Sequence, residues 1–327
     1  MNISGLTDLV LGLTHAKEVL AISEIQSLWS GYGSIKRLLL KGAETPSVIV
    51  KLISPPSSTD HPRGWNTGLS HQRKLKSYQV ESNWYGQRGL DGSWGDARIP
   101  QCYGVHQEGD QVLLVLEDLD AAGFLERHSF VNDLQWKSCV RWLAQFHVAG
   151  MDVDLQGLWE TGTYWHLETR PDELERLDDF ELKQASNAID QKLKSAKFQT
   201  LVHGDAKLAN FCFQPQGDKV AAIDFQYIGG GCGMQDLAYF VGSCFRDEEA
   251  EQREEEALDY YFKFFEEAIK SGASKVSAKE LEAEWRPLYR VAWADFHRFM
   301  KGWSPGHWKL SDYSERVTRG VIESLMV

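Results

Sequence analysis

One segment constrains this chain more than any other: residues 202–225, which read VHGDAKLANFCFQPQGDKVAAIDF. Two short apolar runs, 211–213 and 220–223, flank a turn of Pro, Gln, Gly and Asp, and this pattern predicts a β-hairpin. A hairpin brings the residues on its two sides close together. We therefore expect the polar groups that border this hairpin to share one site.

Those polar groups suit phosphoryl transfer. Asn210 and Asp224 each stand seven positions from Gly217. Near-opposite residues on paired strands lie about 5 Å apart, so an amide oxygen and a carboxylate can hold one cation. Mg²⁺ prefers oxygen ligands and is often held by one or two carboxylates together with substrate phosphates. Asp205 can orient an incoming hydroxyl and accept its proton, and Lys207 can offset charge at a γ-phosphate.

The order and spacing of these residues resemble a known superfamily. H-G-D-A-K-L-A-N followed by I-D-F is similar to the catalytic loop and metal-binding aspartate of eukaryotic-like kinases, in the branch of aminoglycoside phosphotransferases, choline kinases and ecdysteroid-kinase-like proteins. The resemblance implies that Asp205 is the catalytic base and that His203 supports the loop. It also implies that Asn210 and Asp224 bind magnesium. Lys207 matches the lysine that Ser/Thr protein kinases keep two residues after their catalytic aspartate. The alternative is an ordinary polar hairpin.

A lysine in the N-terminal half resembles the nucleotide-binding lysine of kinases. Lys51 lies in the β-branched run VIVKLI, which is similar to the V-A-I-K strand whose lysine pairs with the α- and β-phosphates. An isolated lysine in such a run usually extends to solvent. Glu81 borders a buried stripe on the helix expected over residues 71–87, and the resemblance implies an ion pair between Lys51 and Glu81.

A turn with two glycines precedes this strand. Gly31 and Gly33 lie between the apolar runs 25–29 and 35–40 and would let backbone N–H groups approach phosphate oxygens. Kinases have G-x-G-x-x-G at this place. A plain β-turn therefore explains the two glycines equally well.

A continuous apolar run, 112–116, predicts a strand buried on both faces that stops at Glu117. The run resembles the interlobe hinge of kinases. In the family, backbone groups of such a segment contact the edge of the adenine ring. The resemblance therefore implies that the main-chain groups of Glu117 and Leu119 bind adenine. A core strand that ends in a solvated turn fits the same residues.

Residues 229–233 read GGGCG and raise a rival interpretation, because dinucleotide-binding folds begin with a strand, a glycine-rich turn and a helix. G-x-G-x-x-G would need a glycine at Met234 or Asp236. We therefore interpret the run as a flexible connector. Asp236 then opens a helical stretch, 237–241, and the resemblance implies that it is the structural aspartate that braces the catalytic loop.

Differences from protein kinases narrow the range of possible acceptor substrates. Only twelve positions separate Asp224 from Asp236, and no A-P-E motif follows. This chain has DFQ where protein kinases have DFG, and HGD where they have HRD. An activation loop has no room, so we expect a small-molecule acceptor rather than a protein. The HGD and DFQ forms resemble the ecdysteroid-kinase-like branch, although its catalytic loop often has an aromatic residue where Lys207 sits.

The C-terminal part is expected to be helical and to supply acceptor specificity. Ser277 is typical of an N-cap, and we expect Pro287 to kink the helix and Pro305 to end it. Aromatic residues at helical spacing are more typical of a core than of a pocket. With Asp295 and His297 nearby, an aromatic-walled site could accept a flat hydrophobic alcohol or a choline-like cation. The aromatic residues are Trp285, Tyr289, Trp293, Phe296, Phe299, Trp303 and Trp308.

The composition fits a soluble cytoplasmic enzyme. The 327 residues are 43% hydrophobic and 25% charged, which is enough for a large core and two lobes. A net charge of −12 argues against binding a nucleic-acid backbone or an anionic membrane. Five cysteines without a C-x-x-C pair point away from disulfides and structural zinc. No basic region precedes the apolar residues at the N-terminus, so we expect neither a signal peptide nor a membrane span.

The sequence therefore predicts an α+β protein with a two-lobed protein-kinase-like fold. We expect an antiparallel-sheet N-lobe over residues 1–119 and a mostly helical C-lobe over residues 120–327. The expected activity is transfer of the γ-phosphate of ATP, with Mg²⁺, to a hydroxyl of a small molecule. A catalytically silent kinase-fold protein that binds a nucleotide or a partner is the alternative, which the intact Asp205, Asn210 and Asp224 argue against. A dehydrogenase comes third.

Overall fold

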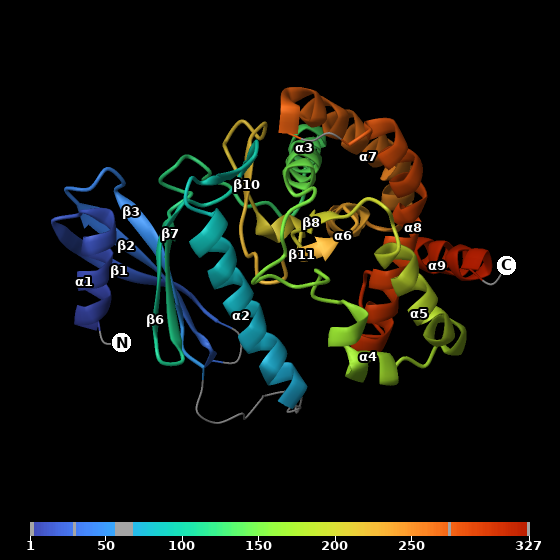
Figure 1. The fold of residues 1–327 in the computed structure, drawn as a ribbon, viewed down its shortest axis with the longest axis horizontal. Coiled ribbons are helices and arrows are strands. Elements are labelled where there is room, and N and C mark those ends of the chain that lie inside the picture. Colours follow the sequence, from blue (N-terminus) through green and yellow to red (C-terminus); the bar gives the residue numbers. More distant parts are fainter. Residues whose placement is uncertain (1–2, 29–30, 56–67, 274–275, 326–327) are drawn as a thin grey trace.

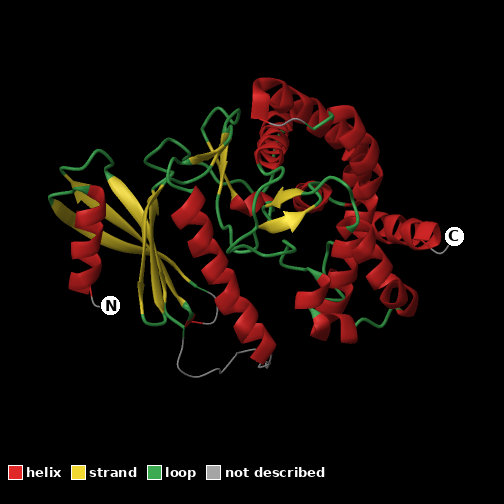
Figure 2. Cartoon of the chain, viewed as in Figure 1, coloured by secondary structure: helices red, strands yellow, loops and turns green. Residues whose placement is uncertain are grey.

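The computed structural model describes residues 3–28, 31–55, 68–273 and 276–325. Within these residues, the N-terminal part is built on an antiparallel sheet that carries helices, and the C-terminal part is mostly helical (Figures 1 and 2). The expected α+β class is confirmed.

The N-terminal sheet has the strand order β1-β2-β3-β7-β6, and its neighbouring strands are antiparallel. Side chains of β7 alternate between its two faces: Leu113 and Val115 pack with helix α1, whereas Leu114 and Leu116 join the core beneath helix α2. Burial on both faces explains why this run is apolar without a break. The elements are α1 (Ile3–Thr14), β1 (Glu18–Ser27), β2 (Gly33–Lys41), β3 (Ser47–Ile53), α2 (Gly68–Arg88), β6 (Cys102–Glu108) and β7 (Gln111–Glu117).

A second, smaller sheet contains the hairpin that the sequence predicted. Strands β9 (Phe211–Phe213) and β10 (Val220–Ala222) are antiparallel, and β10 also pairs in parallel with β5 (Ala97–Arg98), which in turn pairs with β4 (Ser93–Trp94). Ala222 lies opposite Phe211, so the backbone of Ile223 rather than that of Asp224 is opposite Asn210. The pairing of β9 with β10 is therefore shifted by one residue from a pairing that is symmetric about Gly217.

The glycine run after the hairpin is a strand, and our interpretation of it as a flexible connector is wrong. Strand β11 (Gly229–Gly231) pairs antiparallel with β8 (Thr200–Val202). A Cβ at Gly229 would lie 2.3 Å from the carbonyl oxygen of Trp159, and one at Gly230 would lie 2.7 Å from that of Glu160. Close backbone packing therefore requires the glycines, rather than chain flexibility.

Helices make up most of the rest of the described chain (Figure 2). Helix α3 begins with a capping box in which Asn132 and Gln135 exchange side-chain and backbone hydrogen bonds. The elements are α3 (Asp133–Ala149), η2 (Leu167–Thr169), α4 (Pro171–Glu175), α5 (Phe180–Lys194), η3 (Leu208–Asn210), α6 (Met234–Cys244), α7 (Asp247–Ala268), the π-helical η4 (Ile269–Ala273), α8 (Ala278–Trp303) and α9 (Asp312–Leu325).

Helix α8 carries the C-terminal aromatic residues. The Ser277 side chain caps it by accepting a hydrogen bond from the Glu280 N–H, and the helix continues through Pro287 and ends two residues before Pro305. Most of its aromatic side chains are core, as their spacing predicted, whereas Trp303 at its end is 41% exposed and Trp308, which follows the helix, is 46% exposed. The buried ones are Trp285, Tyr289, Trp293, Phe296 and Phe299.

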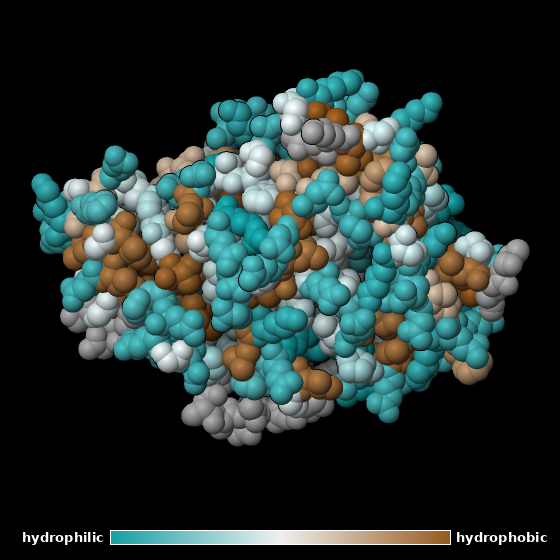
Figure 3. Space-filling model, viewed as in Figure 1, coloured by the Kyte–Doolittle hydropathy of each residue, from teal (hydrophilic) through white to brown (hydrophobic). Residues whose placement is uncertain are grey.

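Polar side chains cover much of the face seen in Figure 3, and apolar ones gather at the left, where Figure 1 places the N-terminal sheet. Exposed leucine and isoleucine side chains occur on the first two strands of that sheet, at Leu20, Ile22 and Leu39. Among the described residues, no helix has both the length and the apolar character needed to cross a membrane.

Asp179 connects three C-terminal helices. As the N-cap of α5, it accepts a hydrogen bond from the Leu182 N–H (3.1 Å). Its carboxylate also pairs with Lys301 of α8 (2.8 Å) and with Arg319 of α9. Burial alone would raise the pKa of Asp179, but the hydrogen bonds from Arg319 and Lys301 outweigh burial and lower this pKa to about 2.

We expect Asp179→Asn, which keeps the helix cap, to destabilise the protein at pH 7 by about 1 kcal/mol, a value reduced for partial exposure. Because the folded-state pKa lies below the unfolded one, the carboxylate contributes fully above about pH 4 and loses its contribution as the pH falls toward 2. Urea unfolding of both proteins at pH 7 and near pH 3 measures this. A difference that does not shrink at the lower pH would contradict the assignment.

Candidate active site

Asp205 lies at the centre of a buried polar cluster on the loop between β8 and β9. Its Oδ2 accepts hydrogen bonds from the Lys207 Nζ (2.7 Å) and from the Asn210 Nδ2 (3.1 Å). Burial raises the pKa of the Asp205 carboxyl, the Lys207 ammonium opposes this rise, and the nearby Asp224 adds to it. A carboxylate with a raised pKa is a better proton acceptor than an exposed one.

Asn210 and Asp224 lie beside this carboxylate. The Asn210 Nδ2 also donates to the Asp205 carbonyl oxygen (2.8 Å), so both of these bonds use the amide nitrogen and leave its oxygen for a cation. Asp224 has a φ of 70°, in the left-handed region, and its side chain is 34% exposed, against 10% for Asp205. The hairpin therefore presents an open carboxylate next to an amide oxygen.

Lys51 connects this cluster to the N-terminal sheet. Its Nζ lies 2.6 Å from Glu81 Oε2 and 3.7 Å from Asp224 Oδ1. Burial alone would lower the pKa of Lys51, but the charges of Glu81 and Asp224 outweigh burial and raise it. The expected ion pair with Glu81 is present, and it directs a buried ammonium group toward the Asp224 carboxylate.

Asp236 fixes the backbone of the catalytic loop from beneath. It is fully buried, and its carboxylate accepts hydrogen bonds from the backbone N–H groups of His203 (2.6 Å) and Gly204 (2.9 Å). The ring of His147 lies 3.1 Å from the same carboxylate. This is the position that the resemblance implied for a bracing aspartate.

The ring of His203 joins the catalytic loop to the segment that carries Asp224. Its Nε2 donates to the carbonyl oxygen of Ile223 (3.0 Å), and its Nδ1 accepts from the Asp205 N–H (3.2 Å). Gly204 between them has a φ of 78°, and a Cβ there would lie 2.2 Å from the Tyr227 carbonyl oxygen. His203 and Gly204 therefore hold the two aspartates in a fixed relation.

The glycine turn has local structural reasons for its glycines. The Gly31 N–H donates to the Leu28 carbonyl oxygen (3.2 Å), so this amide is already bonded. Gly33 has a φ of 136°, and a Cβ there would lie 1.9 Å from the Leu52 carbonyl oxygen. Ser30 of the predicted turn and Trp29 of the apolar run before it lie outside the described residues. A phosphate-binding role for Gly31 and Gly33 stays a prediction.

Several polar groups at the end of β7 and in the segment after it already have hydrogen-bond partners within the protein. The Glu117 N–H donates to the Gln101 carbonyl oxygen (2.8 Å), and the Glu117 side chain pairs with Arg98 (2.5 Å). The carbonyl oxygen of Leu119 accepts from the Phe124 N–H (2.8 Å). An adenine-binding role for Glu117 and Leu119 stays a prediction.

Sequence reasoning missed two residues that approach Asp205 from the C-terminal part. The Tyr239 hydroxyl of α6 donates to Asp205 Oδ1 (3.2 Å), and burial followed by the Asp205 charge keeps the Tyr239 pKa well above its ordinary value. The Lys309 ammonium lies 4.5 Å from the centre of the Tyr239 ring. Neither belongs to a local motif, because both reach the site only through the packing of α6 and the segment after α8.

Asp295 and His297, which we expected near an aromatic-walled site, both have hydrogen-bond partners within the protein. Asp295 pairs with Arg298 (2.8 Å) and accepts a hydrogen bond from the Trp165 indole (3.0 Å). His297 contacts Ser314 and Glu315 (both 3.0 Å). Asp295 is thus a buried structural ion-pair partner, and the expectation that it helps to bind the acceptor is not supported by these contacts.

The donor set around Asp205 fits a magnesium ion. Asn210 and Asp224 offer an amide oxygen and a partly exposed carboxylate, which match the all-oxygen preference of Mg²⁺ and leave room for phosphate ligands. The Asp224 side chain is held in place by a hydrogen bond from Gln226 (2.8 Å) and by the ion pair with Lys51.

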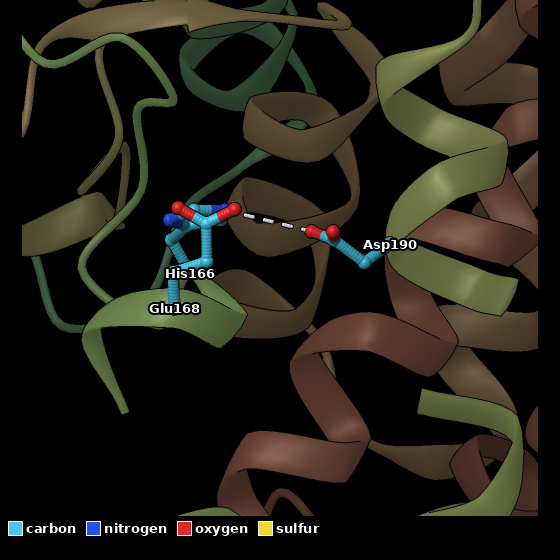
Figure 4. A group of neighbouring side chains, drawn as sticks. All are labelled: His166, Glu168 and Asp190. Carbon is cyan, nitrogen blue, oxygen red and sulfur yellow. Dashed lines mark ion pairs between the residues drawn. The ribbon is translucent and has the colours of Figure 1, made fainter. Parts of the chain in front are cut away.

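A second group of possible metal ligands, His166, Glu168 and Asp190, lies between η2 and α5 (Figure 4). The His166 Nε2 is 3.5 Å from Asp190 Oδ1. The Lys194 ammonium lies 2.7 Å from Glu168 and 3.1 Å from Asp190, so a lysine already fills the place between these carboxylates. We assign this group to an ion-pair network whose His166 and Asp190 are buried.

Comparison with known proteins agrees with the geometry. Residues 83–269, more than half of the chain, match the model of a family described as the phosphotransferase enzyme family, APH. No curated protein matches the chain.

Solved structures show the fold. A putative aminoglycoside phosphotransferase from Ralstonia eutropha JMP134 is 11% identical, with a TM-score of 0.50 over 99% of this chain and 96% of that one. A microcompartment-associated aminopropanol kinase is 15% identical, with a TM-score of 0.50 over 98% of this chain and 97% of that one. The amicoumacin kinase hAmiN, in complex with AMP-PNP, Ca²⁺ and Ami, is 12% identical, with a TM-score of 0.50 over 99% and 93%. The expected kinase-like fold is confirmed.

Proposed function

The chain belongs to the phosphotransferase enzyme family, and from this premise we propose that it transfers the γ-phosphate of ATP to a hydroxyl of a small molecule. One observation carries the proposal: Asp205, Asn210 and Asp224 gather at one place, with the Lys51 ammonium directed toward it. A base, two oxygen donors for a cation and a phosphate-binding cation are the parts that such a transfer needs.

We assign the proton transfer to Asp205. Its carboxylate orients the acceptor hydroxyl and takes the proton as the hydroxyl oxygen forms a bond to the γ-phosphorus. The bond between that phosphorus and the bridging oxygen of ADP breaks in the same displacement. Lys207, which is paired with Asp205 at 2.7 Å, lies where its charge steadies the γ-phosphoryl oxygens.

We assign nucleotide binding to the N-terminal part. Lys51, braced by Glu81, would bind the α- and β-phosphates, and the Glu117 carbonyl and the Leu119 N–H would meet the adenine edge. We place the division between an N-lobe and a C-lobe near Leu119, with residues 1–119 and 120–327 as the two parts.

Asn210 and Asp224 would hold Mg²⁺, which when bound offsets the negative charge of the phosphates. His203 and Asp236 position these groups by fixing the loop backbone. We further propose that the protein works in the cytoplasm, since its five cysteines are all free. From the HGD and DFQ motifs, we propose that the chain is related to the ecdysteroid-kinase-like branch.

The segment between Asp224 and Asp236 supports a small acceptor. Strand β11 and the start of α6 lie within the twelve positions up to Asp236, and β11 pairs with β8. These residues therefore leave no free segment that could serve as an activation loop or as a platform for a protein substrate.

A phosphate-transfer screen tests the proposal. The protein is incubated with ATP and Mg²⁺ and a panel of aminoglycosides, amino alcohols, sterols and sugars, and phosphorylated products are detected by mass spectrometry. We expect transfer to at least one class of hydroxyl compound. Magnesium-dependent ATP binding without any transfer would instead favour a catalytically silent kinase-fold protein, and stabilisation by NAD rather than by ATP would favour a dehydrogenase.

We expect Lys51→Met to raise KM for ATP by about 10- to 100-fold, because it removes a charge-assisted contact to the phosphates. Lys41→Met is the matched control, since Lys41 lies on the same sheet in an exposed pair with Glu18. Steady-state kinetics with varied ATP, and thermal melting of each variant, provide the measurement. An unchanged KM for ATP in Lys51→Met would remove Lys51 from nucleotide binding.

A further inference from the structure

Two cations near the candidate active site have no carboxylate within ion-pair distance in the described part of the chain: Lys309 and Arg246. Lys309 differs from the exposed lysines of this protein because its side chain is half-buried. Burial lowers the pKa of Lys309 to about 8, so its ammonium is still charged at neutral pH. A half-buried cation without an acidic partner has a desolvation cost that a bound anion can offset.

Lys309 lies one aromatic ring away from the proposed base. Its Nζ is 4.5 Å from the centre of the Tyr239 ring, and the hydroxyl of the same tyrosine donates to Asp205 (3.2 Å). The same ammonium lies 5.2 Å from the centre of the Phe296 ring, which packs against the Tyr239 ring. The ammonium is therefore held beside the place where an acceptor hydroxyl would meet Asp205.

Lys309 also borders a cavity between α6, α8 and the segment after α8. Arg246 lines the same cavity, with its guanidinium 4.7 Å from the centre of the Trp308 ring, and Lys309 is 5.7 Å from that ring. The apolar wall consists of Phe245, Trp293, Phe296 and Trp308.

The lining of this cavity holds two cations and one carboxylate, and the charge of the nearby Asp205 also acts on Lys309. Asp247 is the acidic residue in its lining, and its Oδ1 already accepts a hydrogen bond from the Tyr313 N–H (3.0 Å). Burial lowers the pKa of His297 to about 4, so this ring is neutral at physiological pH. The cavity therefore combines aromatic walls with a net positive charge.

We infer that the acceptor is an anionic alcohol: a hydroxyl compound whose carboxylate or phosphate group binds Lys309 and Arg246, with an apolar framework against the aromatic wall. This inference rests on the proposed function, because it places the hydroxyl at Asp205. It argues against the choline-like cation that the sequence left open, and it adds an anionic group to the flat hydrophobic alcohol. A choline-like cation would meet the aromatic rings where Lys309 and Arg246 already lie, and like charges in one cavity repel.

A matched set of acceptors tests the charge preference. Para-(hydroxymethyl)benzoate, para-xylylene glycol and para-(aminomethyl)benzyl alcohol share one aromatic alcohol and differ in charge at the far end. Binding of each is measured by calorimetry in the presence of AMP-PNP and Mg²⁺, and transfer is measured separately as kcat/KM with ATP. We expect the benzoate to bind at least about tenfold more tightly than the glycol and the ammonium compound to bind most weakly.

Variants connect this preference to Lys309. We expect Lys309→Met to abolish the preference for the benzoate and Lys309→Arg to keep it. Lys263→Met, an exposed lysine on α7, removes the same charge without touching the cavity and should bind like the parent protein. Thermal melting checks that each variant is folded.

The outcomes separate this inference from the proposed function. Equal or tighter binding of the ammonium compound, a preference that survives in Lys309→Met, or no binding of the benzoate up to about 10 mM would overturn the inference. Benzoate binding that depends on Lys309, without transfer in the presence of ATP, would instead support the inference and contradict the proposed function.

Discussion

We expect Asp205→Ala to lower kcat by about 10²- to 10⁴-fold, because the variant loses the group to which we assign orientation of the hydroxyl and acceptance of its proton. Nucleotide binding stays largely intact, since Lys51, Glu81 and Asp224 hold their own contacts. Steady-state turnover with the best acceptor, together with calorimetry of AMP-PNP binding, measures the two effects separately.

Two further variants make this result specific. Asp205→Asn keeps the shape of the side chain and should be nearly as inactive, because an amide cannot accept the proton. Asp218→Asn removes an exposed carboxylate from the turn of the same hairpin and should leave turnover unchanged. Unchanged turnover in Asp205→Ala would remove Asp205 from the role of base, whereas a loss in Asp218→Asn would point to a general effect on the hairpin.

We expect Asp224→Asn to lower kcat/KM by about 10²-fold or more and to raise the Mg²⁺ concentration needed for half-maximal activity, because a neutral amide replaces the carboxylate that we assign to the metal. Asparagine is the better replacement here. The backbone of this residue has a φ of 70°, which asparagine adopts more readily than alanine does.

The dependence on metal separates this effect from the loss of an ion pair. Lys51 keeps Glu81 at 2.6 Å when Asp224 is neutral, so KM for ATP measured at saturating Mg²⁺ should change much less than the Mg²⁺ requirement. An Asp224→Asn protein with the Mg²⁺ requirement of its parent would show that this carboxylate does not bind the metal.

Local patterns predicted the parts of the site that lie close together in the sequence. The hairpin at 211–222 follows from two apolar runs around a turn, and β7 follows from a run that is apolar on both faces. The resemblance supplied the pair of Lys51 and Glu81 and the bracing position of Asp236, which the structure contains.

The features that the sequence did not predict depend on packing between distant segments. The run at Gly229–Gly231 has the composition of a loop, and it is a strand because the backbones of Trp159 and Glu160 come too close for any side chain. Tyr239 and Lys309 approach Asp205 from 34 and 104 positions away in the chain. The periodicity of residues within one helix or loop does not predict such long-range contacts.

The most direct test of a shared cation site is anomalous diffraction from a crystal of the protein with AMP-PNP and Mn²⁺. The account predicts a Mn²⁺ peak about 2 Å from both the Asn210 side-chain oxygen and the Asp224 carboxylate, with the nucleotide phosphates on its other side. A peak at His166 and Asp190 alone, or nucleotide bound without any ion at Asn210 and Asp224, would contradict it.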